Sequence, residues 1–439
     1  MKKRSAFRRL VLVVLVLAVL AGIAARAGGP LVVGGPGMAE GVPFIWTINP
    51  LTYWTDLGNL GWMDNTAANN LVQEAFQAWQ DVPTATISFS SSGPLGADVT
   101  ALNIMPVMDA LENCSTLPGD PGGGIAKPRT IIYDTDGSIL EGLGEDPNSV
   151  LGFATALCLT TDGVNNNFNR GFALINGQFV TGPTSTTLVK AVMIHEFGHM
   201  IGLDHSQINL NCLTSYCAPG SDDLEGVPTM FPVLIDEPAM STLATDDIAA
   251  ISALYPESTF PTSTGRITGH VLFSDGQTPA QGFNVIARKT DDALVTAVSS
   301  VSGFLYTVDV GSPLIPSWYG SAFGSRDPAL IGYYDLPGLP PGDYTVEVEA
   351  INNSGDHPFV DGSSVGPIGN YGFQFPLPSL LPTPPPCTPE YLLSGATASC
   401  SSATATTVSV APGSPVSTGT DVILIGTPPR YDAWEDAGP

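Results

Sequence analysis

The pattern of apolar and polar positions changes its period near residue 258, and this change divides the chain into two parts. Before it, apolar residues recur at helical spacing, which is typical of amphipathic helices, and short alternating runs between them indicate strands. After it, short alternating runs separated by Gly, Pro and Asp turns are typical of a β-sandwich. We therefore expect an α+β unit followed by an all-β unit. The predicted helices span 67–81, 184–200 and 245–255, and the predicted strands span 44–48, 86–90, 129–133, 267–273, 284–288, 304–308, 344–349 and 421–425.

Shifts in composition mark the boundaries of these units. The first 27 residues are expected to be a signal peptide, because a basic start precedes an apolar run of 16 residues and an Ala25-Arg26-Ala27 cleavage site. The alternative, an uncleaved membrane anchor, is disfavoured because spanning a bilayer takes roughly 20 apolar residues. We expect a secreted protein that is not inserted in a membrane after cleavage. The predicted divisions are 1–27 signal peptide, 28–42 short lead, 43–257 α+β unit, 258–264 polar linker, 265–375 β-sandwich and 376–439 Pro-rich spacer with a low-complexity tail.

Charge and cysteine content narrow the partners and the compartment. The chain has 15 basic and 41 acidic residues, a formal net charge of −26, and six of the basic residues lie in the expected signal. Such an acidic protein repels nucleic acid and anionic membranes, so neither is expected as a partner. Six cysteines in a secreted chain suggest three disulfides, for which the sequence alone permits 15 connectivities. Proximity favours Cys212–Cys217 and Cys387–Cys400, which leaves Cys114 with Cys158; a cysteine zinc site competes weakly, since no C-x-x-C spacing occurs.

One segment carries a pattern that predicts chemistry: residues 195–206 read His-Glu-Phe-Gly-His-Met-Ile-Gly-Leu-Asp-His-Ser. His195 and His199 are four residues apart, so on a helix both imidazoles project from one face and can share a metal ion. Gly202 permits the left-handed backbone that ends a helix, after which the chain can return His205 as a third ligand. Three protein ligands leave a fourth position open, which is typical of a catalytic Zn²⁺ site.

The competing interpretation is chance, because a bare H-E-x-x-H arises in many ordinary helices. The glycine and the third histidine at fixed offsets make chance a poor explanation, and three of the five histidines in the chain fall in this segment. We therefore predict a zinc site with His195, His199 and His205 as ligands. Glu196 lies beside the first ligand, where it can take a proton from water at the metal, and it is the predicted catalytic residue.

The full motif, H-E-x-x-H-x-x-G-x-x-H followed by Ser206, resembles the signature of the matrixin (matrix metalloproteinase) branch of the metzincin zinc proteases. Other segments are also similar to that family: FQAW at 76–79 to its first helix, PTMFP at 228–232 to its Met-turn, and 243–256 to its last helix. The resemblance covers 43–257 and implies a twisted mixed sheet with three main helices. It places Met230 beneath the metal; an ordinary core methionine is the alternative, which the position between motif and last helix disfavours.

Several features depart from that family. No cysteine precedes Cys114, so no propeptide cysteine is expected to block the zinc. No histidine lies between residues 28 and 194, so the family's second, structural zinc should be missing. His205 and Met230 are 25 residues apart, which is more than is usual in matrixins. Leu234 stands where a tyrosine usually lines the specificity pocket, so the resemblance implies no particular substrate preference.

The resemblance also suggests where a substrate would bind. Residues 150–154 (VLGFA) are similar to the rim strand of the matrixin cleft, where an extended substrate adds as another strand. Residues 134–139 (DTDGSI) resemble part of a calcium loop, which makes Ca²⁺ a second candidate ion. A plain Asp-Gly turn is favoured there, because the bidentate glutamate at the twelfth position is lacking. The candidate substrate-binding residues are Leu151, Gly152, Phe153, Ala154, Pro232 and Leu234.

The all-β unit carries weaker signals. Residues 265–270 (GRITGH) and 339–344 (LPPGDY) resemble transthyretin-like or carboxypeptidase-regulatory-like β-sandwiches appended to secreted enzymes, and the polar linker predicts that the first unit folds without the second. His270 and His357 are interpreted as ordinary surface or core histidines. We expect a monomeric extracellular zinc endopeptidase that hydrolyses protein or peptide substrates through a zinc-bound water activated by a glutamate. The alternative is a secreted or surface binding protein in which the β-sandwich carries the function and the protease domain serves maturation.

Overall fold

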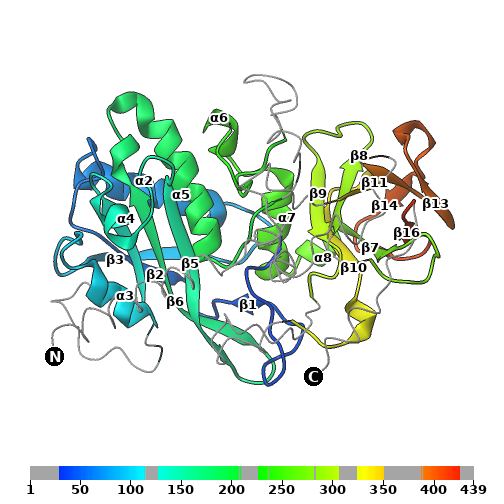
Figure 1. The fold of residues 1–439 in the computed structure, drawn as a ribbon, viewed down its shortest axis with the longest axis horizontal. Coiled ribbons are helices and arrows are strands. Elements are labelled where there is room, and N and C mark those ends of the chain that lie inside the picture. Colours follow the sequence, from blue (N-terminus) through cyan, green and yellow to red (C-terminus); the bar gives the residue numbers. More distant parts are fainter. Residues whose placement is uncertain are drawn as a thin grey trace.

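The computed structural model shows two packed parts joined by a short helix (Figure 1). It describes residues 29–112, 114, 127–206, 208, 226–235, 237–280, 283–305, 324–350, 387 and 389–425, and every structural statement below concerns these residues. We call the described part of 29–257 the α/β domain and that of 265–425 the β-domain. The long helices lie in the α/β domain and most strands in the β-domain, which is compatible with the expected α+β class.

The sheet of the α/β domain is organised around one long strand, β6. Along one edge β6 pairs with β4 and β1, both parallel, and along the other with antiparallel β5. β2 pairs with β4, and β3 with β2, again in parallel. Among the described strands β5 pairs with β6 alone, so β5 is an edge strand of this sheet. The strands are β1 (Phe44–Ile45), β2 (Leu51–Thr55), β3 (Phe89–Pro94), β4 (Arg129–Asp134), β5 (Gly152–Thr161) and β6 (Asn166–Asn176).

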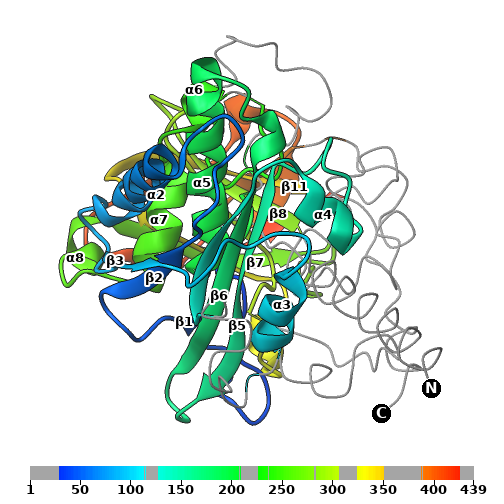
Figure 2. The same cartoon turned by 90° about the vertical axis from the view of Figure 1, so that its left-hand side faces the viewer.

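Helices cover both faces of this sheet (Figure 2). The alternation within β4 shows the two layers, because Ile131 and Tyr133 join the core beneath α2 and α5, whereas Ile132 joins the core beneath α3 and α4. The two cores together bury the sheet. The helices of this domain are α2 (Asn65–Gln80), α3 (Ile104–Glu112), α4 (Ser138–Leu143), α5 (Thr186–Met200), α6 (Glu237–Met240) and α7 (Thr245–Leu254).

Aromatic packing joins the two longest helices. The ring of Phe76 on α2 stacks on that of Phe197 on α5 with 4.0 Å between centroids. The Trp79 indole N–H donates to the Ile194 carbonyl at 2.9 Å.

The helices predicted at 67–81, 184–200 and 245–255 are confirmed, with small shifts at their ends. α2 begins earlier than predicted because the Asp64 carboxylate accepts the Ala67 N–H at 2.9 Å and caps the helix.

Some strand boundaries differ from the predictions. The first strand is confined to 44–45 instead of 44–48, and the strand predicted at 86–90 lies at 89–94. The second shift has a clear cause, because the Thr86 N–H donates to the Tyr255 carbonyl at 2.7 Å and leaves the sheet ladder. The strand predicted at 304–308 is wrong at its start, where Phe304 lies in a turn; residues 306–308 lie outside the described residues.

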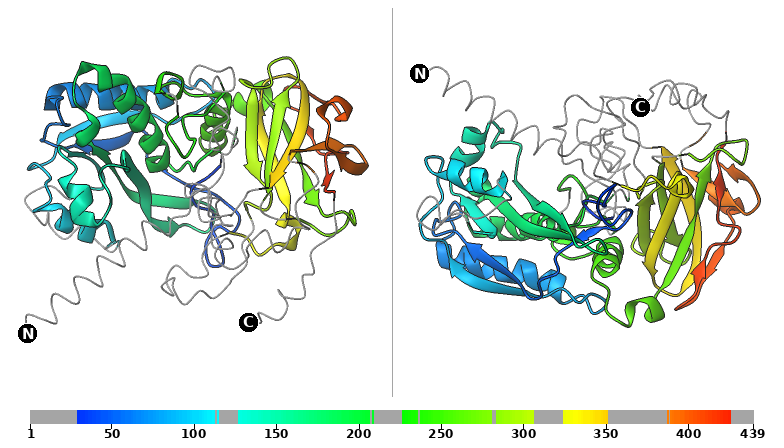
Figure 3. Two further views of the ribbon diagram at one scale, coloured as in Figure 1. Left: turned by 45° about the horizontal axis from the view of Figure 1, so that its top comes forward. Right: turned by 90° about the horizontal axis from the view of Figure 1, so that it is seen from below.

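The β-domain is a sheet of ten hydrogen-bonded strands around one apolar core (Figure 3). Five of these strands, β12–β16, come from the stretch 376–439 that the sequence predicted to be a spacer and tail. That prediction needs correction, because Leu392, Val408 and Val422 from these strands are buried in the core. The strands are β7 (Gly265–Leu272), β8 (Phe283–Lys289), β9 (Ala297–Val301), β10 (Tyr333–Leu339), β11 (Gly342–Ala350), β12 (Glu390–Leu393), β13 (Ala396–Ser399), β14 (Val408–Val410), β15 (Pro415–Val416) and β16 (Val422–Ile423).

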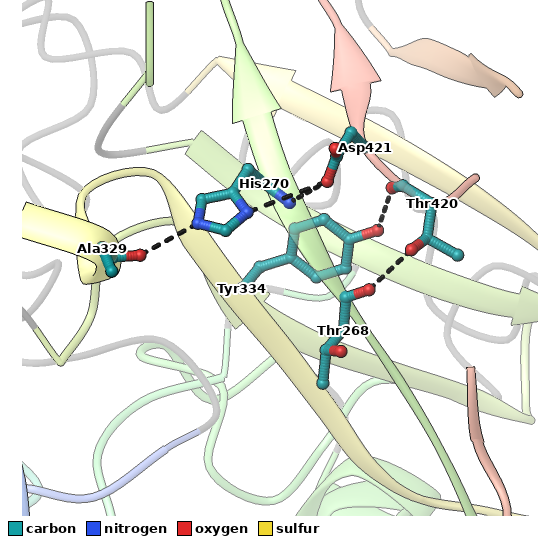
Figure 4. Close-up of polar contacts among 6 residues, drawn as sticks. All are labelled: Thr268, His270, Ala329, Tyr334, Thr420 and Asp421. Atoms are coloured by element: carbon teal, nitrogen blue, oxygen red, sulfur yellow. Dashed lines mark hydrogen bonds and ion pairs between the residues drawn. The ribbon is translucent and has the colours of Figure 1, made fainter. Parts of the chain in front are cut away.

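Polar contacts fix the last of these segments to β7 and β10 (Figure 4). The buried Tyr334 hydroxyl donates to the Thr420 carbonyl at 2.5 Å, and the Thr420 hydroxyl donates to the Thr268 carbonyl at 2.6 Å. The His270 backbone N–H donates to Asp421 Oδ1 at 2.8 Å, and its imidazole Nε2 lies 2.9 Å from the Ala329 carbonyl. His270 therefore takes part in structural contacts at the surface of the domain. His357 lies outside the described residues.

The joint between the two domains is largely exposed, as expected for a polar linker: Ser258, Thr259, Pro261, Thr262 and Ser263 all face solvent. Residues 258–264 contain a short helix, α8 (Phe260–Ser263), whose first side chain is only 8% exposed. A Cβ added at Gly338 of β10 would lie 2.8 Å from the Ala249 Cβ of α7, so β10 and α7 are in direct contact. The linker is therefore exposed except at Phe260, and the two domains are in direct contact beside it.

Two of the three expected disulfides are confirmed, Cys114–Cys158 and Cys387–Cys400. Both bonds are compatible with folding in an oxidising compartment. The expected Cys212–Cys217 pair and the expected signal peptide lie outside the described residues. Within the described part of the chain, no helix combines the length and apolar character needed to cross a bilayer.

Candidate metal centre

Three histidines converge at the C-terminal end of α5. His195 and His199 lie one turn apart on this helix, and Gly202, with φ of +101°, ends it in the left-handed conformation. The chain then turns back and brings His205 to the other two. His199 Nε2 lies 3.1 Å from His195 Nε2 and 3.1 Å from His205 Nε2. The three predicted ligands therefore form one cluster. Within the described residues, this is the group of side chains that could hold a metal ion.

The cluster has the dimensions and the chemistry that zinc requires. Zn–N bonds of ~2.0–2.1 Å in a tetrahedral site place ligand nitrogens roughly 3.3 Å apart, close to the observed spacing. Burial lowers the pKa of His195 and lowers that of His199 to about 3, and burial with the neighbouring imidazoles lowers the pKa of His205 well below its ordinary value. All three rings are therefore neutral near pH 7, which is the form that binds metals.

Backbone carbonyls orient two of the three rings. His195 Nδ1 lies 2.7 Å from the Thr229 carbonyl, and His199 Nδ1 lies 2.9 Å from the Leu203 carbonyl. A proton on each Nδ1 makes these bonds and leaves the Nε2 lone pair directed at the centre of the cluster. Such contacts fix the tautomer and the ring plane before any metal arrives.

Glu196, the predicted catalytic residue, follows the first of these histidines on α5. It is 6% exposed, and its Oε2 is buried without a hydrogen-bond partner among the described residues. Burial raises the pKa of Glu196 to about 8. A buried polar atom without a partner is costly to a fold, so this carboxylate is kept available for a group that is not part of the chain.

Met230 packs against the underside of α5, close to the histidines. It is 2% exposed, and a Cβ added at Gly198 would lie 2.2 Å from its sulfur, so only glycine at 198 allows the approach. The Met230 N–H donates to Asp247 Oδ1 at 3.0 Å, and the Thr229 N–H donates to Asp247 Oδ2 at 2.8 Å. Asp247 thereby holds the loop whose Thr229 carbonyl contacts His195. In the sequence, Asp247 has no feature beyond its place in the first turn of a predicted helix.

The predicted substrate-binding residues belong to two segments, the start of β5 and the stretch after Met230, and Phe153 packs in the core beneath α3 and α4. Gly152 begins β5, and a Cβ added there would lie 3.2 Å from Glu196 Cγ, so the start of β5 lies against the Glu196 side chain. Pro232 and Leu234 follow Met230 and are partly buried; Leu234 packs against apolar residues of α5 and its surroundings. Leu151, Phe153 and Ala154 are also partly buried along the start of β5.

The calcium-like segment 134–139 forms a turn. Both carboxylate oxygens of Asp134 accept backbone N–H groups, from Ile139 at 3.1 Å and Leu140 at 2.9 Å, so this side chain caps α4. Gly137 adopts φ of +84°, as a tight turn requires. These contacts agree with the favoured interpretation as an Asp-Gly turn.

Comparison with models of known protein families finds none that matches the chain, and comparison with curated proteins finds no significant match.

Proposed function

We propose that the chain is a secreted zinc endopeptidase of the metzincin type, with a matrixin-like catalytic centre. The observation that carries this proposal is the convergence of three neutral imidazole Nε2 atoms beside a buried carboxylate oxygen without a partner. Structural zinc sites use four protein ligands, whereas three histidines leave a position open to water and substrate. His195 and His205 are partly exposed, as ligands of an accessible centre must be.

His195, His199 and His205 would hold Zn²⁺, which, when bound, polarises a carbonyl group and increases the acidity of water. Glu196 would act as the general base: the charge of Zn²⁺ would favour its ionised form, and the carboxylate would then take a proton from the attacking water and deliver it to the leaving amine. Its position one residue after His195 keeps the carboxylate on the rim of the cluster. The Thr229 and Leu203 carbonyls hold the rings in the orientation that this chemistry needs.

The substrate would be an extended peptide that binds along β5. The free edge of this strand can donate and accept backbone hydrogen bonds, as in β-strand addition. Because Gly152 lies against Glu196, a peptide bond held on this edge is close to the carboxylate. Leu234 and Pro232 would form an apolar wall for one substrate side chain.

Cleavage of a peptide library by the full chain, with matched variants, tests this function. Glu196→Ala removes the proton acceptor but no metal ligand, so it should retain bound zinc and lose about 10²–10⁴ in turnover. Glu141→Ala provides the control, because Glu141 is exposed on α4 and has no assigned role. A chelator should abolish cleavage, and added zinc should restore it. Near wild-type turnover in Glu196→Ala, or no cleavage by the zinc-loaded chain, would contradict the proposal and favour a binding protein.

A further inference from the structure

The segment that carries the third histidine is fastened to its surroundings directly after that residue. Ser206 follows His205 and is 1% exposed. Its N–H donates to the Met230 carbonyl at 2.7 Å, and its hydroxyl donates to Asp246 Oδ2 at 2.5 Å. The position of His205 therefore depends on Asp246, which lies 40 residues further along the chain.

Asp246 also contacts the β-domain. Its Oδ1 accepts the backbone N–H of Ser299 at 2.7 Å, and its Oδ2 lies 3.1 Å from the Ser299 hydroxyl. Asp246 is 1% exposed and Ser299 is 2% exposed, so both groups are removed from water. One buried carboxylate thus bridges the loop of the α/β domain and strand β9, which Figure 1 shows beside α7.

Strand β9 supplies this contact because it ends the order of strands in its sheet. Its partner on one side is β8, and on its other side the Ser299 N–H meets Asp246 instead of another strand. The start of α7 therefore covers the edge of β9 that faces away from β8. Covering a sheet edge with a helix is a common way to protect it from pairing with another strand.

Apolar contacts run parallel to this polar bridge. Ile208, three residues after the third histidine, is 1% exposed and clusters with Ile286 and Ala297 of the β-domain. A Cβ added at Gly226 would lie 1.5 Å from the Leu294 carbonyl oxygen. Gly226, near the end of the segment between His205 and Met230, therefore also lies against the β-domain. Two ends of the segment between His205 and Met230 are thus packed on the β-domain.

We propose that Asp246 is a positioning residue for the third zinc ligand, and that through Ser299 the β-domain forms part of the framework of the metal centre. This inference rests on the proposed zinc site and adds to it a role for the second domain. The His205 imidazole gains no hydrogen bond at Nδ1 from the described residues, so the adjacent Ser206 fixes this ligand through the backbone. Groups that orient metal ligands from outside commonly change metal affinity by about 10–100-fold when removed.

The test measures the Kd for Zn²⁺ of the full chain by competition with a chromophoric chelator. Asp246→Ala should raise this Kd by about 10–100-fold. Asp246→Asn should restore most of the affinity, because an amide oxygen can accept the Ser299 N–H while hydroxyl groups accept from the amide nitrogen. Tyr334→Phe is the control: it removes a buried hydrogen bond within the β-domain, to the Thr420 carbonyl, that does not involve Asp246, and it should lower the melting temperature without changing the Kd.

A double-mutant cycle keeps the test decisive if Asp246→Ala does not fold. Ser206→Ala and Ser299→Ala each remove one hydroxyl contact of Asp246, and their effects on zinc affinity should be non-additive because both act through the same carboxylate. Additive effects, or an unchanged Kd in folded Asp246→Ala, would overturn the inference and leave Asp246 a purely structural residue. A wild-type chain that binds no zinc would instead overturn the proposed function.

Discussion

The metal centre and the contact between α7 and β9 differ in how their parts are distributed along the chain. The three histidines and Glu196 lie within eleven consecutive residues, and one helix with one turn brings them together. The contact that supports them joins Ser206, Asp246 and Ser299, which are separated by 40 and 53 residues. The proposed reacting groups are therefore brought together by local geometry, whereas the groups that hold them are brought together by the packing of two domains.

The largest effect is expected at the metal centre itself. His199 lies between the other two histidines, and its Nε2 is 3.1 Å from each of theirs. His199→Ala removes one of three ligands, so the purified protein should carry almost no zinc and cleave no peptide. Metal analysis of the variant against wild type measures this. Undiminished zinc in folded His199→Ala would place the metal elsewhere.

An intermediate effect is expected where the two domains touch. Gly338 has φ of +72°, and a Cβ there would lie 2.8 Å from the Ala249 Cβ. Gly338→Ala therefore adds a steric clash to left-handed strain and should cost about 2–3 kcal/mol of unfolding free energy. Gly395→Ala is the matched control, because Gly395 has φ of +69° with no atom near its Cβ, and it should cost about 1 kcal/mol.

Denaturant unfolding, followed by zinc release and by loss of secondary structure, checks this prediction. It also tests whether the two domains unfold together. If the domains share one framework, zinc release and loss of secondary structure in Gly338→Ala shift together to lower denaturant. Two separate transitions, with the zinc-binding part unchanged, would show that the α/β domain folds by itself, as its sequence predicted.

The smallest effect is expected at the substrate edge. A Cβ at Gly152 would lie 3.2 Å from Glu196 Cγ and 2.9 Å from the Leu174 carbonyl oxygen. Gly152→Ala should displace the carboxylate slightly and lower kcat about tenfold, equivalent to roughly 1.4 kcal/mol, with zinc content unchanged. Steady-state kinetics with a fluorogenic peptide measure the change. A kcat equal to that of wild type would separate Gly152 from the catalytic geometry.

Much of the α/β domain could be predicted because its signals are local. The periodicity of 67–81 and 184–200 gives the two long helices, and the spacing of the histidines gives their convergence. The Asp134 turn and the Cys387–Cys400 disulfide also follow from short-range patterns. The Cys114–Cys158 disulfide spans 44 residues and is predicted only as the pair left once nearby cysteines are matched.

The rest could not be predicted because it depends on contacts between distant segments. The strands after residue 389 are rich in Ser, Thr and Ala, and their few buried apolar side chains give a weak pattern without the sheet that they complete. Thr-Asp-Asp at 245–247 predicts a helix start, and only the fold shows that Asp247 holds the Met230 loop while Asp246 reaches Ser299. In the sequence, Phe260 lies within a polar linker. Its burial becomes clear only in the fold, where its ring lies next to Gly338 and Gly338 lies next to Ala249.

X-ray absorption at the zinc edge of the purified full chain tests whether the three histidines hold a catalytic zinc ion. We expect one tightly bound zinc per chain, with three imidazole nitrogens at about 2.0–2.1 Å and one further light-atom ligand. The histidine cluster with its 3.1 Å nitrogen separations already has the spacing for this set. Sulfur scattering at about 2.3 Å, a shell of six oxygens, or the absence of stoichiometric zinc would contradict it.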